Sequence, residues 1–387
     1  MGKDFFDDNN VELEELLTLD ALTTVSKAGF KKLDIELPAN ADEARFLIDN
    51  YYQIQKMRIT ADSQLRALNQ KFDKNSTDTK KAVEKISSLN FVVEQYKAME
   101  ANAKNLLDAY CETNPLSSWA SRVTGIGPVL AASLPAYFSI KKEADGSTTM
   151  HAGSWWSYAG LDDNNRPWLG KEKATKIVED CIKVHGGKLD DSTMVTICGR
   201  TQWNLSHYEN FKPKKDSKTG EIKPGCYKID KKTGQKIWDK NAVIAASSVI
   251  PYNKSLKVVC YKIGTSFHKL CNNEKSMYGR LFKERLQYET ERNEAGMYAE
   301  QAKQIAASKN FTNKEVKEMY ESGKLPVSHI YQRCERYVTK LFISHCFECA
   351  YWNEYGEMPP RPYILMFSEG KHNDYIGPEV PYDSSKW

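Results

Sequence analysis

Hydrophobic residues recur at helical spacing in the first third of the chain. Between residues 44 and 68 they fall mostly three and four positions apart, and a second stripe of the same spacing runs from about residue 76 to residue 110. This periodicity predicts two amphipathic helices. Because the polar stretch between them is short, we expect an antiparallel hairpin. Residues 1–114 are therefore predicted to be a helical hairpin that acts as a brace or an oligomerisation arm.

The second half of the chain repeats the helical pattern around a basic insertion. Apolar stripes at helical spacing occur in three further segments, residues 254–271, 276–292 and 329–352. Between residues 212 and 240, KKDSKTGEIKPG is followed by KIDKKTGQKIWD. The shared Lys-Thr-Gly predicts tight turns between short strands, with Gly220 and Gly234 at positive φ. Ahead of this flap, residues 189–211 are predicted to form a helix-turn-helix centred on Gly199.

The segment VTGIGPVLAASLPAYF, residues 123–138, carries the clearest chemical signal. Its two glycines allow a tight turn that a partner can approach closely, and Pro128 suits the first position of a helix. The free amides and the dipole at that helix N-terminus suit a phosphate oxygen, while Ile126 is expected to point inward. This pattern is typical of a helix-hairpin-helix that grips the DNA backbone; the alternative is an ordinary tight turn. We expect DNA contacts from Thr124, Gly125, Ile126, Gly127 and Val129.

These patterns together predict a mainly α fold: an N-terminal long helical hairpin plus a helix-hairpin-helix core with a small basic β-hairpin insertion. After the N-terminal hairpin, four further segments are expected in chain order. They are a helix-hairpin-helix DNA-binding region at 115–175, an inserted helical and β-flap subdomain at 176–250, a C-terminal helical part of the core at 251–352 and an extended tail at 353–387.

The charge distribution favours a polyanionic partner. The net charge is +4, but residues 200–290 hold 19 Lys or Arg against 8 Asp or Glu, whereas residues 1–60 hold 7 against 12. A basic middle is typical of nucleic-acid binding, with DNA the first candidate and RNA a second; a solvated lysine-rich surface is the alternative. We expect further phosphate contacts from Arg200, Lys254, Lys257, Arg333, Arg336 and Lys340, the last three along one side of a helix.

GIGPVLAASLPAYF, followed by WWSYAGLDD from residue 155, resembles the C-terminal half of transposases of the IS one-ten/one-sixteen type, recombinases guided by a bridge RNA. In that family a GIGP-type hairpin precedes a YAGL stretch, and a basic helix follows. NKSLKVVCYKIGTSFHKL and HIYQRCERYVTKLFISH are similar to helices of longer phage- and prophage-borne relatives. The resemblance covers residues 115–350 discontinuously. It implies a DNA-binding hairpin of phage or mobile-element origin, in the cytoplasm of a bacterial host.

Two departures from that family argue against catalysis. The transposases carry an N-terminal RuvC-like domain with metal-binding acids on a β-rich scaffold, whereas residues 1–112 have helical patterns. They also place a serine nucleophile soon after YAGL, where this chain has DDNNRP at residues 162–167. We therefore expect a transposase-related DNA-binding protein that is not catalytic and needs no cofactor. The alternatives are a virion or scaffold protein and an active recombinase with Mg²⁺ and a relocated nucleophile at Ser154, Ser157 or Ser266.

Other sites carry weaker signals, and no metal site is expected. Nine cysteines without a secretory signal are typical of reduced thiols in a cytoplasm, and the chain has no apolar run long enough for a membrane span. Cys346 and Cys349 form a lone CxxC, and the spacing of a mixed zinc set is irregular, with Cys181, His185, Cys198 and His207. The aromatic residues at 155, 156, 158 and 168 are interpreted as a core cluster behind the hairpin; base stacking is the alternative.

Overall fold

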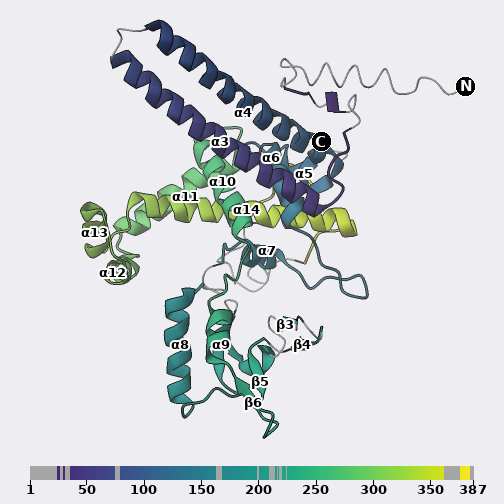
Figure 1. Cartoon of the computed structure of the whole chain (residues 1–387), viewed down its shortest axis with the longest axis vertical. Coiled ribbons are helices and arrows are strands. Elements are labelled where there is room, and N and C mark those ends of the chain that lie inside the picture. The colour runs from purple at the N-terminus through teal and green to yellow at the C-terminus, as the bar shows by residue number, and fades with distance from the viewer. Residues whose placement is uncertain are drawn as a thin grey trace, which may run out of the picture.

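The computed structural model describes residues 24–26, 29–30, 35–74, 79–162, 168–197, 200–208, 214–215, 217, 220–223, 225–360 and 375–383. The fold is mainly α, as the sequence predicts. Most of the regular structure in these residues is helical, and the strands form three separate two-stranded antiparallel sheets (Figure 1).

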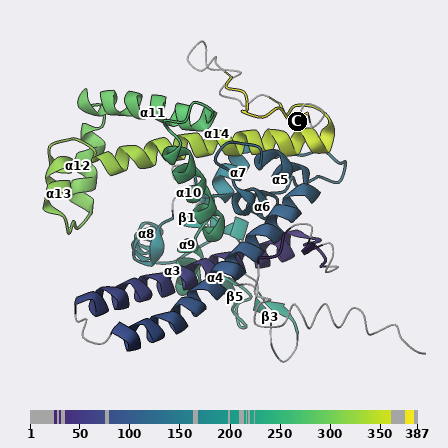
Figure 2. The same ribbon diagram turned by 90° about the horizontal axis from the view of Figure 1, so that it is seen from above.

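The predicted N-terminal hairpin is confirmed. Helix α3 (Ala41–Lys74) and helix α4 (Thr79–Thr113) lie side by side and project from the rest of the molecule (Figures 1 and 2). The Asn40 side chain caps α3 by accepting the amide N–H groups of Asp42 and Glu43, each at 3.0 Å. Across the interface, Arg58 and Gln55 both donate to the carboxylate of Glu100, which joins the two helices.

The main core lies where the base of this hairpin meets the long C-terminal helix. Six helices surround it: α5 (Pro115–Ala120), α6 (Pro128–Tyr137), α7 (Ala152–Tyr158), α10 (Lys254–Lys269), α11 (Met277–Glu294) and α14 (Val327–Tyr355). The aromatic rings of Trp119 and Phe342 stack at 5.9 Å, and Phe267 packs edge-on against Phe342. The predicted apolar stripe of α10 is buried at Leu256, Val259, Ile263 and Phe267, because its helical spacing turns these side chains to one face.

A second, smaller core forms below the first (Figure 1). It is built from α8 (Gly170–Val184), β1 (Met194–Ile197), β2 (Arg200–Asn204), the short 3₁₀ helix Leu205–Tyr208, β5 (Tyr227–Ile229), β6 (Lys236–Trp238) and α9 (Lys240–Ser247). Its buried residues include Val178, Val195, Leu205 and Val243. Helix α8 begins before residue 176, so the predicted boundary there crosses a helix of this core.

The predicted helix-turn-helix at residues 189–211 is wrong. Strands β1 and β2 pair antiparallel instead, with Met194 opposite Asn204 and Val195 opposite Trp203. The run of Val195, Thr196 and Ile197 is β-branched, which restricts side-chain rotation in a helix and suits a pleated strand. The turn residue Gly199 lies outside the described residues.

The predicted basic flap is confirmed as two small hairpins. Strand β3 (Lys214–Lys215) pairs with β4 (Ile222–Lys223), and β5 pairs with β6. Gly220 and Gly234 have φ of 73° and 68°, the left-handed conformation that tight turns require. Five of the described helices were not predicted from the sequence: α7, α8, α9, α12 (Ala299–Ser308) and α13 (Lys314–Glu321).

Candidate nucleic-acid interface

Two short helices joined by a tight loop occupy the predicted hairpin segment. Helix α5 is capped by Asn114, whose side chain accepts the amide of Leu116 at 3.0 Å. The loop of residues 121–127, here called the hairpin loop, is closed by its own backbone: the amide of Val123 donates to Ala120 and that of Ile126 to Val123, both at 3.0 Å. Gly127 then serves as the N-cap of α6. The segment thus has the helix–loop–helix geometry that the glycine pattern predicts.

The two glycines of the hairpin loop have different roles. Gly125 has φ +102°, and a Cβ there would lie 2.6 Å from Cδ1 of Leu270. Its carbonyl accepts the hydroxyl of Ser266 at 2.6 Å, which fastens the loop to the end of α10. Gly127 has φ −86°, is exposed, and a Cβ there would meet nothing within 4 Å. Gly125 is therefore a packing requirement, whereas Gly127 is open to a partner.

The apolar residues of the loop face the core. Ile126 is 4% exposed and Val129 is 8% exposed, so the expected inward orientation of Ile126 is confirmed. The amide of Ile126 is used inside the loop, where it donates to Val123, whereas Val129 lies in the first turn of α6, where helix amides lack partners within the helix. Amides of this kind are the groups by which helix N-termini hold phosphate oxygens.

The backbone beside the hairpin loop already binds an oxyanion from the chain itself. The amide of Thr124 donates to one oxygen of the Glu379 carboxylate at 2.7 Å, and the amide of Met277 donates to the other at 2.8 Å. Met277 is the first residue of α11, where free amides and the helix dipole favour negative charge. The segment 375–383 is anchored there by the indole N–H of Trp119, which donates to the carbonyl of Val380 at 2.9 Å.

Exposed basic side chains surround this point. The turn of residues 270–276 between α10 and α11, here called the α10–α11 turn, packs against the hairpin loop, and the hydroxyl of Thr124 donates to the Lys275 carbonyl at 3.4 Å. Exposed cations on the two turns and the adjoining helix ends are Arg122, Lys269, Lys275, Arg280 and Lys283. Glu274 and Glu284 are exposed in the same region, so the surface has a net positive charge.

The predicted stripe on α14 does not form one cationic surface. The guanidinium of Arg333 bonds to the Glu289 carboxylate at 2.9 Å and lies 4.4 Å from the ring centre of Tyr298. Glu289 is 1% exposed; burial alone would raise its pKa, but the hydrogen bonds from Tyr298 and Arg333 outweigh this, and the pKa lies below its ordinary value. Lys340 faces α7 instead, 5.1 Å from the ring centre of Trp156.

Two of the remaining predicted cations, Lys254 and Lys257, lie in the first turn of α10, away from the hairpin loop. Lys254 is exposed at the first position of α10, and the Lys257 ammonium lies 4.3 Å from the ring centre of Tyr252. The loop packs near Ser266, so about 18 Å of helix separates it from Lys254, at 1.5 Å per residue. Arg200 begins β2, but its side chain lies outside the described residues. Arg336 is exposed on α14.

The other candidates have structural surroundings. Trp155 is buried and stacks on Phe138 at 4.4 Å, as a core residue behind the hairpin, whereas Trp168 is 53% exposed. Cys346 and Cys349 are buried in α14, where burial raises the pKa of both thiols.

The mixed zinc set, which the sequence did not favour, is described only at Cys181 and His185. The side chains of Cys198 and His207 lie outside those residues. Cys181 bonds weakly to the carbonyl of Met194 at 3.4 Å. Among the serines proposed as nucleophiles, Ser266 gives its hydroxyl to Gly125.

Sequence reasoning missed Glu379 and the basic residues of the α10–α11 turn. Glu379 lies 255 positions from Thr124 along the chain, and nothing in the local pattern of the tail indicates the contact. Lys275 and Arg280 were visible as part of the basic middle region, but only packing places them beside the hairpin loop.

Comparisons with known proteins complete the description of this surface. Among the described helices, none has an apolar stretch long enough to cross a bilayer. No protein-family model matches the chain, and neither the curated proteins nor the solved structures include a match.

Proposed function

We propose that this protein binds DNA through the sugar–phosphate backbone at the surface formed by the hairpin loop and the α10–α11 turn. The observation that carries the proposal is the pair of amides, of Thr124 and Met277, that together hold the Glu379 carboxylate. Carboxylate and phosphate oxygens accept hydrogen bonds from backbone amides in the same way. A site built to hold one oxyanion, open at Gly127 and surrounded by cations, suits a phosphate backbone.

This mode of binding depends on the shape of the nucleic acid and not on its base sequence. Backbone amides and lysine or arginine contacts to phosphates position a protein on DNA without reading bases. A role in DNA recombination, in a phage or other mobile element of a bacterial host, rests on the resemblance of residues 115–350 to the transposases. We propose a non-catalytic role within it, because the family's serine position is occupied by Asp162 and its neighbours.

A salt titration tests the proposal. Binding to duplex, single-stranded and branched DNA, and to duplex RNA, is measured by fluorescence anisotropy at increasing salt. Each phosphate contact contributes about 0.9 to the slope of log affinity against log salt on duplex DNA, so Lys275→Ala and Arg280→Ala are each expected to lower the slope by about 1.

Lys324→Ala is the matched control, because Lys324 is exposed in the loop between α13 and α14. It should leave the slope unchanged. Affinity that does not respond to salt, or equal effects of all three substitutions, would contradict the proposal. Tighter binding to duplex RNA than to any of the three DNA forms would show that RNA is the preferred ligand of this surface.

Self-association through the N-terminal helices is a second proposal. Large apolar side chains are exposed along α3 and α4, at Phe46, Met57, Ile59, Leu89, Phe91, Val92 and Met99. Exposed apolar surface of this extent on a projecting hairpin favours contact with another copy. Sedimentation analysis of the protein and of Phe91→Glu tests this proposal, which requires the substitution to reduce the oligomer.

A further inference from the structure

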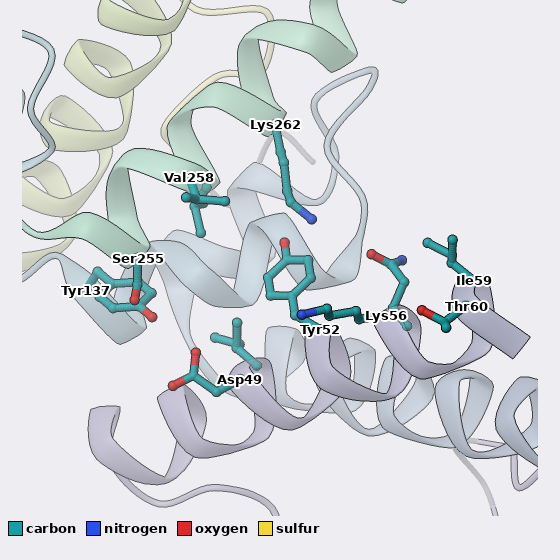
Figure 3. Close-up of a pocket in the computed structure, with 12 residues that line it drawn as sticks. Asp49, Tyr52, Lys56, Ile59, Thr60, Tyr137, Ser255, Val258 and Lys262 are labelled. Carbon is teal, nitrogen blue, oxygen red and sulfur yellow. The ribbon is translucent and has the colours of Figure 1, made fainter.

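A cavity of about 380 Å³ opens between α3, α6 and α10 (Figure 3). Its lining on α10 runs from Ser255 to Lys262 and includes no residue of the hairpin loop or of the α10–α11 turn. Lys262 lies about one helical turn from Ser266, whose hydroxyl bonds to that loop. Its volume falls in the range of small-molecule sites. It is therefore a site separate from the proposed DNA surface.

One wall of the cavity holds a cation, Lys262, for which the described part of the chain offers no ion-pair partner. The ammonium of Lys262 lies 3.7 Å from the ring centre of Tyr52, and Figure 3 shows it pointing from α10 toward Tyr52 on α3. Burial lowers the pKa of Lys262, with no contribution from a carboxylate. Lys56 adds a second, exposed ammonium at the rim.

The surroundings of Lys262 on α10 differ from those of Arg58 on α3. Arg58, on the opposite side of the helix, bonds to Glu100 and Asp62. In the described residues Lys262 forms no ion pair, although burying an uncompensated charge is costly. Asp49 is the acidic residue of the cavity lining, and it lies two helical turns before Lys56 on α3. A negatively charged ligand would compensate the Lys262 charge.

The rest of the lining is apolar or hydroxylic. Ile48 and Val259 are buried at 1% and 2% exposure, while Val258 and Ile59 are 52% and 51% exposed at the opening. Tyr137 hydrogen-bonds with the side chain of Ser255, which holds the ring in place as part of the wall. Such walls suit an apolar body attached to the anionic group.

We propose that this cavity binds a small organic anion, with its carboxylate or phosphate against Lys262 and Lys56 and its apolar body against Val258 and Ile59. The Tyr52 ring holds the Lys262 ammonium in place by a cation–π contact. Polymeric nucleic acid is a poorer fit, because the cavity holds only about 380 Å³ between three helices.

Calorimetry with simple probes tests this inference. Phenyl phosphate and benzoate carry the two anionic groups on the same ring, inorganic phosphate lacks the ring, and benzyl alcohol lacks the charge. We expect the better of the two charged aromatic probes to bind with a dissociation constant of about 1 mM or tighter, as for other ligands of this size. Whichever of the two binds more tightly identifies the anionic group.

Two variants separate charge from folding. Lys262→Met keeps the length of the side chain and is expected to weaken binding at least about tenfold, the loss of a charge-assisted contact. Lys324→Met, an exposed lysine in the loop between α13 and α14, should bind the probes like the unchanged protein. Circular dichroism verifies that both variants are folded.

Three results would overturn the inference: no binding of either charged aromatic probe, equal binding by Lys262→Met, or benzyl alcohol binding as tightly as benzoate. Saturating the protein with duplex DNA is expected to leave probe affinity unchanged, because the cavity lining includes no residue of the hairpin loop or of the α10–α11 turn. Competition between them would place the probe in the DNA surface instead and reject a separate cavity site.

Discussion

Replacing Gly125 by alanine is expected to destabilise the hairpin loop by about 2–4 kcal/mol. A residue with a Cβ at φ +102° costs about 1–3 kcal/mol in backbone strain. The new Cβ would also lie 2.6 Å from Cδ1 of Leu270. Because that atom is the end of a flexible side chain, it can move away at a cost of about 1 kcal/mol.

Gly127→Ala is the matched control, two positions away in the same loop. Its φ of −86° is ordinary for alanine, and a Cβ there meets nothing within 4 Å. Only the weaker N-cap preference of alanine remains, which costs less than about 1 kcal/mol.

Chemical denaturation gives the free energy of unfolding of each variant, and native-state hydrogen exchange gives the local effect. The amides of Val123 and Ile126, which donate to Ala120 and Val123, should exchange faster in Gly125→Ala than in Gly127→Ala. Equal losses of stability in the two variants would refute the division of roles between the glycines. Gly127→Val should then lower DNA affinity while leaving stability nearly unchanged, whereas Gly125→Val would lower both.

Three further predictions follow from the contacts of the tail and of α14. Glu379→Gln is expected to raise DNA affinity, measured by anisotropy, because it removes a negative charge from the amides of Thr124 and Met277. Unchanged affinity would show that DNA does not bind where Glu379 lies. Arg333→Ala should lower the free energy of unfolding by about 1–3 kcal/mol in denaturant titrations, because it deprives the buried Glu289 of a charged hydrogen bond. A loss of DNA affinity as large as that of Lys275→Ala, with the free energy of unfolding unchanged, would contradict this. Burial lowers the pKa of His345 to about 4, below the unfolded value of about 6.5, so the unfolded state binds more protons between these values. The free energy of unfolding should then fall by about 3 kcal/mol as the pH falls through this window, and a pH series on His345→Gln should lack that loss.

Local periodicity accounts for the parts of the fold that were predicted correctly. The stripe at Leu256, Val259, Ile263 and Phe267 is buried because a helix turns every third or fourth residue to the same side. The β1–β2 hairpin was missed because a short apolar run is compatible with helix and strand alike, and the second core of α8 and α9 selects the strand.

The candidate site was only half visible in the sequence. Gly125 and the inward Ile126 follow from short-range geometry, since the tight turn needs positive φ at a residue without a Cβ. The spacing of Arg333, Arg336 and Lys340 is compatible with one charged helix face. Spacing alone does not reveal which side chains of neighbouring helices contact these residues. Glu289 of α11 takes the Arg333 guanidinium.

The sequence by itself determined the helical class, the N-terminal hairpin and the glycine loop, because each depends on residues a few positions apart. Tertiary structure alone decided which groups meet: Glu379 with the amides of Thr124 and Met277, and Lys262 with Tyr52. Those contacts join segments that are distant along the chain. Their geometry is set by how the helices pack around one core, which no local pattern encodes.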